Sequence, residues 1–353
     1  MKAVDPARVQ AVVDSLGATA DGAVAGLPLG AAALKVRIAH SGLTREELSA
    51  LSAAFLDDRR RAVRGVLGED AFQAAGVDFI LLPVPGSIAA LYRGAQDYTV
   101  VLSLGLVEAL RLSCVAGQLQ SALQGLRASG KLESAMGVEQ AGRKLYVLDQ
   151  MIAYLNASAV LAHLTARRVP NVVAALDTEL VRKANVIVEA ALMFVLLHEL
   201  GHVEYQRAST HPATVWEFAV PEELDARQEE ELFADKHALD SAPAAFRLPM
   251  VHAATFVLQL YSYIDLLRDG PSRTHPLSVN RLAAMRGLVV PSEVDAVGDA
   301  AVQNAIELGR SLQAQASQGT VPCQRIAALE RFVKVRDQID WRSAQEVLQA
   351  IAT

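Results

Sequence analysis

Cysteine is scarce in this chain, since the 353 residues contain only Cys114 and Cys323. Two cysteines are too few for a framework of disulfides, so they indicate either a reducing compartment or no redox role. A signal peptide is not expected either, because acidic residues interrupt the N-terminal segment where that signal needs an unbroken apolar region. We therefore expect a cytoplasmic protein, and the alanine-rich composition is typical of a bacterial one.

An excess of basic residues is also lacking, because 39 acidic residues outnumber 33 basic ones and leave a net charge of -6. This balance argues against a nucleic-acid-binding surface, and no polybasic stretch is present for anionic lipid. The best candidate for a membrane span, residues 250–267, contains His252, Gln259 and Asp265, which indicates a buried amphipathic helix instead. We expect no nucleic-acid partner and no stable membrane insertion.

The pattern of apolar residues predicts a mainly α protein with a small β-sheet, an α+β fold. Helical periodicity covers residues 106–128, 134–166, 171–207, 222–241, 248–268, 276–287, 293–316 and 322–352. Over residues 77–104, short β-branched and aromatic runs alternate with proline and glycine, which predicts two or three strands. The chain then divides into a helical segment 1–76, a core 77–290 and a helical segment 291–353, and all three can form one compact domain.

Two histidines and a glutamate stand inside a strongly apolar stretch, FVLLHELGHVEYQ. His198 and His202 are four residues apart, so one face of a helix brings both imidazoles within reach of one ion. Zinc accepts two such nitrogens and a carboxylate oxygen, and it keeps a fourth position for water. Glu199 is placed beside that ion, where a base takes a proton from the water, and Gly201 keeps bulk away. The alternative is a buried helix whose histidines are satisfied by ordinary hydrogen bonds.

A glutamate from a second helix is the expected third ligand. A metzincin would need glycine and histidine where this chain has Tyr205 and Ala208, so that class is excluded. Downstream, Glu231 and Asp235 are four residues apart on one face of a predicted helix. Glu231 can bind the ion, and Asp235 can accept the free ring N–H of a ligating histidine and fix its tautomer. The alternative is that residues 229–231 form a solvated acidic face, but the apolar residues that follow favour a buried position.

Four pieces of the chain, in order, resemble the gluzincin peptidases of the CAAX-prenyl-endopeptidase and heat-shock membrane-peptidase type. These pieces are YTVVLSLGLVEAL, HELGH, ELFADKHA and RTHPLSVNRLAAM. The resemblance covers residues 77–290 and implies a zincin-type catalytic core with extra helices at both ends, one Zn²⁺ ion and a protein or peptide substrate. Because no spanning helix is expected here, the closer comparison is to soluble minigluzincins. Phage-exclusion peptidases, which also combine a His-Glu-any-any-His helix with extra helical segments, are a more distant analogy.

The resemblance also implies roles for residues outside the two metal motifs. It places His275 near the cleft as a catalytic donor to the oxyanion, unless this residue only enters a helix at the following proline. Arg281 is expected to brace an acidic side chain near the site. Tyr98, Val100 and Leu102 are expected to pair with an extended substrate by β-augmentation, unless their strand is merely the edge of the sheet.

Together these residues predict a zinc-dependent endopeptidase of narrow specificity with Glu199 as its general base. The alternative is a regulatory or binding protein that retains a structural zinc without peptidase activity. Glu199 favours the peptidase, because holding a metal does not require this residue. A cytoplasmic endopeptidase needs restraint, and the terminal helical segments carry no catalytic motif. We therefore expect these segments to cover the cleft and keep the enzyme latent until it is triggered.

Overall fold

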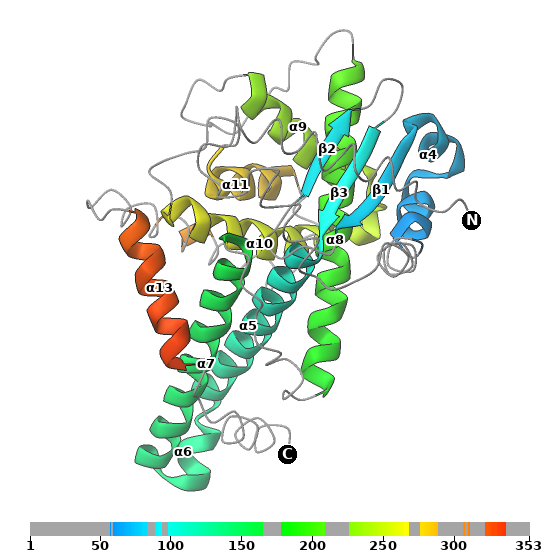
Figure 1. Cartoon of the computed structure of the whole chain (residues 1–353). Helices are drawn as coiled ribbons and strands as arrows, with labels where there is room; N and C mark the ends of the chain where they lie inside the picture. The colour runs from blue at the N-terminus through cyan, green and yellow to red at the C-terminus, as the bar shows by residue number, and fades with distance from the viewer. Residues whose placement is uncertain are drawn as a thin grey trace.

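The computed structural model describes residues 57, 59–82, 89–93, 98–164, 178–208, 226–267, 276–288, 306, 307, 310 and 322–336. Its strands are β1 (Val77–Leu82), β2 (Ala89–Arg93) and β3 (Tyr98–Ser103). Its helices are α4 (Glu69–Ala75), α5 (Leu104–Ser129), α6 (Lys131–Met136), α7 (Val138–Leu164), α8 (Thr178–Arg207), α9 (Ala226–Ser241), α10 (Ala244–Leu267), α11 (Ser278–Leu288) and α13 (Pro322–Arg336). Helices dominate and one small sheet is present, which confirms the predicted fold class (Figure 1).

The sheet is mixed, with the strand order β1-β3-β2. Strand β1 pairs with β3 in parallel, whereas β2 pairs with β3 in the antiparallel direction. All six residues of β3 are buried, because this strand has a neighbour on each side and helices against the sheet.

This strand order contradicts the prediction that Tyr98, Val100 and Leu102 pair with a substrate. Val100, for example, lies between Phe79 of β1 and Leu91 of β2. Both edges of β3 are therefore occupied, and an extended peptide has no backbone groups to pair with there. Among the described strands, β1 and β2 are the ones that lie at the edges of the sheet.

A long helical hairpin of α5 and α7 follows the sheet. Ser103 ends β3 and caps α5, since its hydroxyl accepts a hydrogen bond of 3.2 Å from the N–H of Leu106. Gly130 and Gly137 have φ angles of 59° and 84°, and they bound the short helix α6 that turns the chain back. The helix predicted over residues 134–166 is therefore broken at Gly137, and α7 begins after it.

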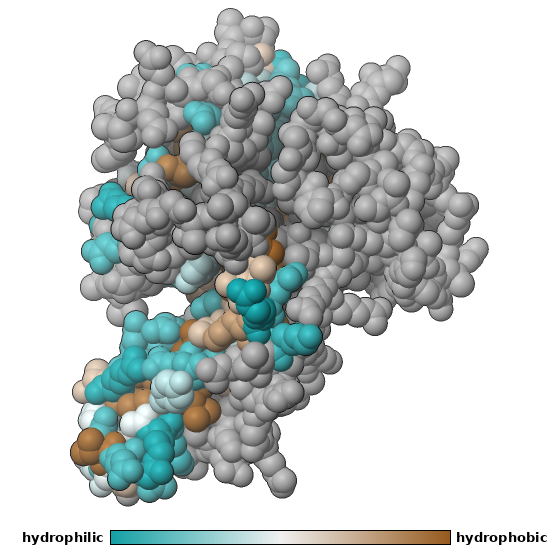
Figure 2. All heavy atoms as spheres, turned by 60° about the vertical axis from the view of Figure 1, so that its left-hand side comes forward, coloured by the Kyte–Doolittle hydropathy of each residue, from teal (hydrophilic) through white to brown (hydrophobic). Residues whose placement is uncertain are grey.

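Helix α8 is central to the fold and packs against α5, α9 and α10 (Figure 1). Helix α13 lies beside α7, away from the sheet. Figure 2 shows the far end of the α5–α7 hairpin as a mixture of hydrophilic and hydrophobic residues, not as one apolar patch. Its large exposed apolar side chains are Val138 and Tyr146.

Residues on both sides of residue 76 share the same core. Val63 is fully buried, and Phe72 stacks on Phe79 of β1 with the ring centroids 6.2 Å apart. Arg60 forms an ion pair with Asp78 at the start of the sheet. A chain that begins at residue 77 would therefore lose buried side chains as well as any cover for the cleft.

Within the residues that the structure describes, two helical stretches are long and apolar enough to cross a membrane, Val138–Ala162 of α7 and Arg182–Arg207 of α8. The sequence pattern singled out residues 250–267 instead. In each of the two stretches, 67% of the most apolar 18 residues is buried inside the fold. Central helices of a folded core are buried to this extent as well. Length and composition alone therefore do not distinguish a membrane span from a core helix in these two stretches.

Candidate metal centre

The two histidines of the apolar motif lie on one face of α8, as their spacing predicts. Their Nε2 atoms are 3.2 Å apart, and the ring planes are nearly perpendicular, at 89°. His198 is 7% exposed, since Phe194 and its neighbours on α8 belong to the core. The Nε2 atoms of the two histidines therefore point at the same small volume beside the helix.

Helix α9 adds a carboxylate to this pair of nitrogens. Glu231 Oε2 lies 3.4 Å from His198 Nε2, and Glu231 Oε1 lies 3.6 Å from His202 Nε2. A tetrahedral zinc site with bonds of about 2.0–2.2 Å separates its ligand atoms by about 3.3–3.6 Å. The three residues therefore have the chemistry and the spacing to hold one metal ion.

Gly201 allows α8 and α9 to approach closely enough for this arrangement. A Cβ atom at Gly201 would lie 2.6 Å from the Cα of Ala234, which is a backbone atom that cannot rotate away. Gly201 stands between the two histidines, and Ala234 stands between Glu231 and Asp235. The small residues of both motifs therefore bring the two ligand-bearing helices together.

Gly201→Ala is expected to destabilise the fold by about 1–3 kcal/mol, because the added methyl group forces the helices apart. It should also weaken metal binding, since the same displacement moves Glu231 away from the histidines. Gly142→Ala is the matched control, because Gly142 lies in α7 and a Cβ there meets no atom within 4 Å. Urea denaturation and zinc titration of both variants test this, and equal stability of the two would contradict the close approach.

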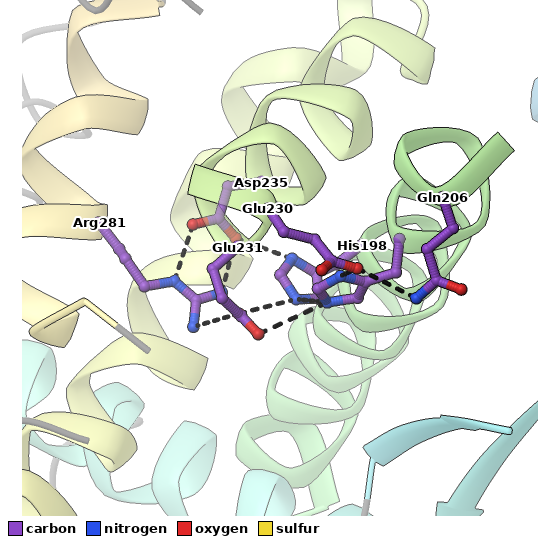
Figure 3. Close-up of polar contacts among 7 residues, drawn as sticks. His198, Gln206, Glu230, Glu231, Asp235 and Arg281 are labelled. Carbon is purple, nitrogen blue, oxygen red and sulfur yellow. Dashed lines mark hydrogen bonds and ion pairs between the residues drawn. The ribbon is translucent and has the colours of Figure 1, made fainter. Parts of the chain in front are cut away.

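His198 is oriented by a buried ion pair. Its Nδ1 lies 2.9 Å from Asp235 Oδ1, and Arg281 donates to both oxygens of Asp235 over 2.7 and 2.8 Å (Figure 3). Arg281 also reaches Glu231, with Nη1 3.2 Å from Oε2. This arginine from α11 thus lies between the two carboxylates of α9 and neutralises part of their charge.

The buried charges shift the pKa values of this group. Burial raises the pKa of Asp235, but the charge and hydrogen bonds of Arg281, and then His198, hold it below its ordinary value. Burial lowers the pKa of His198, but hydrogen bonds to Asp235 and Glu231 and the charges of both outweigh this and raise it to about 9. Without a metal, His198 is therefore protonated at neutral pH, and metal binding is coupled to the release of that proton.

His202 is oriented by residues that the sequence did not single out. Its Nδ1 lies 3.1 Å from Glu230 Oε1, and Gln206 donates to the same oxygen over 3.2 Å. This hydrogen bond with His202 lowers the pKa of Glu230 more than partial burial raises it. A local signal was present for Gln206, which lies one helical turn after His202, but no local pattern distinguishes Glu230 from its acidic neighbours.

A cavity of about 410 Å³ opens beside the ligands. Its wall contains the residues Ala89, Leu91, Phe194, Val195, His198, Glu199, His202, Gln206, Glu230, Glu231, Val257, Leu258, Tyr261 and Arg281. Glu199 is only 6% exposed and lies in the same wall as all three ligands. The lining combines these polar residues with apolar residues of α8, α10 and the edge strand β2.

The structure places three of the four other predicted site residues outside the cavity, and it does not describe the fourth. Tyr98, Val100 and Leu102 of β3 are not part of the cavity wall. His275 lies outside the residues that the structure describes. The structure therefore brings together His198, Glu199, His202, Glu231, Asp235 and Arg281 and adds Glu230 and Gln206.

Comparison with known proteins supports a peptidase. Residues 140–301 match the model of the family Peptidase U49. The matched region is just under half of the chain and runs from α7 past α11, so it contains every residue of the metal centre. No curated protein and no solved structure matches the chain at a significant level. The match indicates a peptidase, which acts on protein or peptide substrates, and it does not indicate a particular catalytic type.

Proposed function

We propose that the chain is a zinc-dependent endopeptidase of the gluzincin type. The observation that carries this proposal is the position of Glu199, buried in the wall of the cavity that also contains His198, His202 and Glu231. A protein that only retains zinc needs the three ligands and the carboxylates that orient the histidines, Asp235 and Glu230, but it does not require Glu199. Burial of such a group costs free energy, which a catalytic role explains.

The residues of the cavity have distinct roles in this proposal. His198, His202 and Glu231 would hold a zinc ion, which would supply a Lewis acid for the attacking water and the peptide carbonyl. Glu199 accepts the proton that the water loses and passes it to the departing amine. The apolar wall from α8 and α10 excludes other water molecules, which strengthens the electrostatic interactions inside the cavity.

We further propose that an extended substrate pairs with β2. Ala89 and Leu91 of this strand line the cavity, and β2 lies at the edge of the described sheet. Pairing there places the backbone of a peptide alongside the metal ligands, whereas β3 has no open edge. This pairing requires several residues on the substrate, so the enzyme is expected to cleave within peptides and to leave dipeptides intact.

A library of peptides incubated with the purified full chain tests the proposal. We expect internal cleavage of extended peptides, complete loss of cleavage with a zinc chelator and recovery when zinc is added back. Cleavage that persists in the chelator would contradict metal dependence. Cleavage of dipeptides alone would contradict pairing with β2. A chain that holds zinc but cleaves nothing would favour the regulatory or binding protein that retains a structural ion.

Latency and a cytoplasmic location stay proposals from the sequence. Residues 1–56 lie outside the described part of the chain. Helix α13 packs against α7 and α10, and it contributes no residue to the wall of the cavity. If a terminal segment restrains the enzyme, limited proteolysis of the termini should raise its activity. Unchanged activity after such trimming would remove the idea.

A further inference from the structure

The two histidines of the metal centre are held in different ways. His198 contacts Asp235, which is fully buried and is held by Arg281. His202 contacts Glu230, whose side chain is 22% exposed and is held by the neutral Gln206. One support is a buried ion pair, and the other is a partly exposed carboxylate with a neutral partner; Figure 3 draws both pairs.

We propose that Glu230 is a positioning residue that orients His202 for the metal, with Gln206 holding Glu230 in place. This inference rests on the proposed metal centre and extends it beyond the three ligands. Neutral imidazole has one N–H and one lone pair, so Nε2 of His202 binds a metal only when Nδ1 carries the hydrogen. An acceptor 3.1 Å from Nδ1 selects that tautomer and fixes the rotation of the ring.

Gln206 completes this support from the same helix as His202. Its position four residues later places it on the same face of α8, and its amide donates to Glu230 Oε1. This oxygen therefore has two partners, His202 Nδ1 and Gln206 Nε2. The Glu230 side chain also lines the cavity. The carboxylate is thus held through Oε1, and the side chain is 22% exposed.

Adjacent glutamates on α9 consequently have different roles. Glu231 offers its carboxylate to the metal, whereas Glu230 offers its carboxylate to Nδ1 of His202, the ring nitrogen that does not face the metal. Glu229, the first member of the acidic triplet, is exposed and does not contact His202. A variant at Glu230 should change the metal site without unfolding the chain, because this side chain is partly exposed.

Zinc affinity of the full chain, measured by competition with a chelating dye, tests the proposal without any substrate. Loss of a carboxylate behind a metal-bound histidine typically weakens metal binding about 10–100-fold. We expect that loss for Glu230→Ala and a smaller loss for Glu230→Gln, because the amide oxygen still accepts from Nδ1. Glu229→Gln is the matched control and should bind zinc as the unchanged chain does.

A second readout separates positioning from a general effect of charge or stability. Cobalt in place of zinc has visible absorption bands that respond to the orientation of its ligands, and Glu230→Ala should shift these bands whereas Glu229→Gln should not. Thermal unfolding of the metal-free variants should be the same within error. The inference is overturned if Glu230→Ala binds zinc as tightly as the unchanged chain. It is also overturned if Glu230→Ala and Glu229→Gln weaken zinc binding equally. Failure of the unchanged chain to bind zinc would instead overturn the proposed function.

Discussion

Glu199→Gln is expected to abolish peptide hydrolysis and to leave the zinc content of the chain unchanged. Glutamine has nearly the same size and fills the same place in the wall of the cavity, so the fold and the three ligands should persist. Its amide cannot accept a proton, however, and loss of a general base lowers kcat by about 10²–10⁴-fold. Single-turnover cleavage of a library-selected peptide, together with elemental analysis of the same sample, measures both quantities.

Glu204→Gln is the matched control for this variant. Glu204 lies on α8 as Glu199 does, but it is exposed and pairs with Arg207, away from the cavity. Its replacement should leave kcat and zinc content as they are. If Glu199→Gln cleaves peptides at the normal rate, Glu199 is not the base and the proposed mechanism is wrong.

His198→Ala is expected to reduce bound zinc below detection and to abolish hydrolysis with it. The variant removes one of three protein ligands, and it also removes the partner of Asp235 in the buried ion pair with Arg281. A metal site with two protein ligands left, His202 and Glu231, lacks the donors that hold zinc against dilution and dialysis. Elemental analysis after dialysis measures the loss.

His252→Ala provides the comparison for a histidine outside the centre. His252 lies on α10 and does not line the cavity, so this variant should retain zinc. Full zinc occupancy in His198→Ala would contradict the assigned ligands, even if hydrolysis were lost for another reason.

The candidate ligands could be predicted from the sequence because their signal is local. His198 and His202, like Glu231 and Asp235, are four residues apart, and an α-helix puts such pairs on one face whatever else the chain does. Apolar residues around both pairs showed which face is buried. In the structure these faces of α8 and α9 meet, with the closest contact at Gly201.

The order of the strands could not be predicted in this way. The short runs between residues 77 and 104 predict strands, but the pairing of β3 with both β1 and β2 depends on contacts between residues far apart in the chain. Tyr98, Val100 and Leu102 therefore appeared open to a substrate, and the structure buries them in the centre of the sheet. The sheet edge beside the metal ligands belongs to β2.

Glu230 was missed for a different reason. An acidic triplet on a helix is usually solvated, and its composition does not show which carboxylate turns toward a neighbouring helix. That outcome depends on the separation and rotation of α8 and α9, which bring Glu230 to 3.1 Å from His202 Nδ1. A rule based on one helix alone cannot supply such a distance.

Anomalous scattering from crystals grown with zinc tests the central claim most directly. The account predicts one anomalous peak at the zinc edge, within bonding distance of His198 Nε2, His202 Nε2 and Glu231, with Glu199 beside it but not bound. A peak at any other set of side chains, or no peak in crystals that diffract well and contain zinc, would contradict the account.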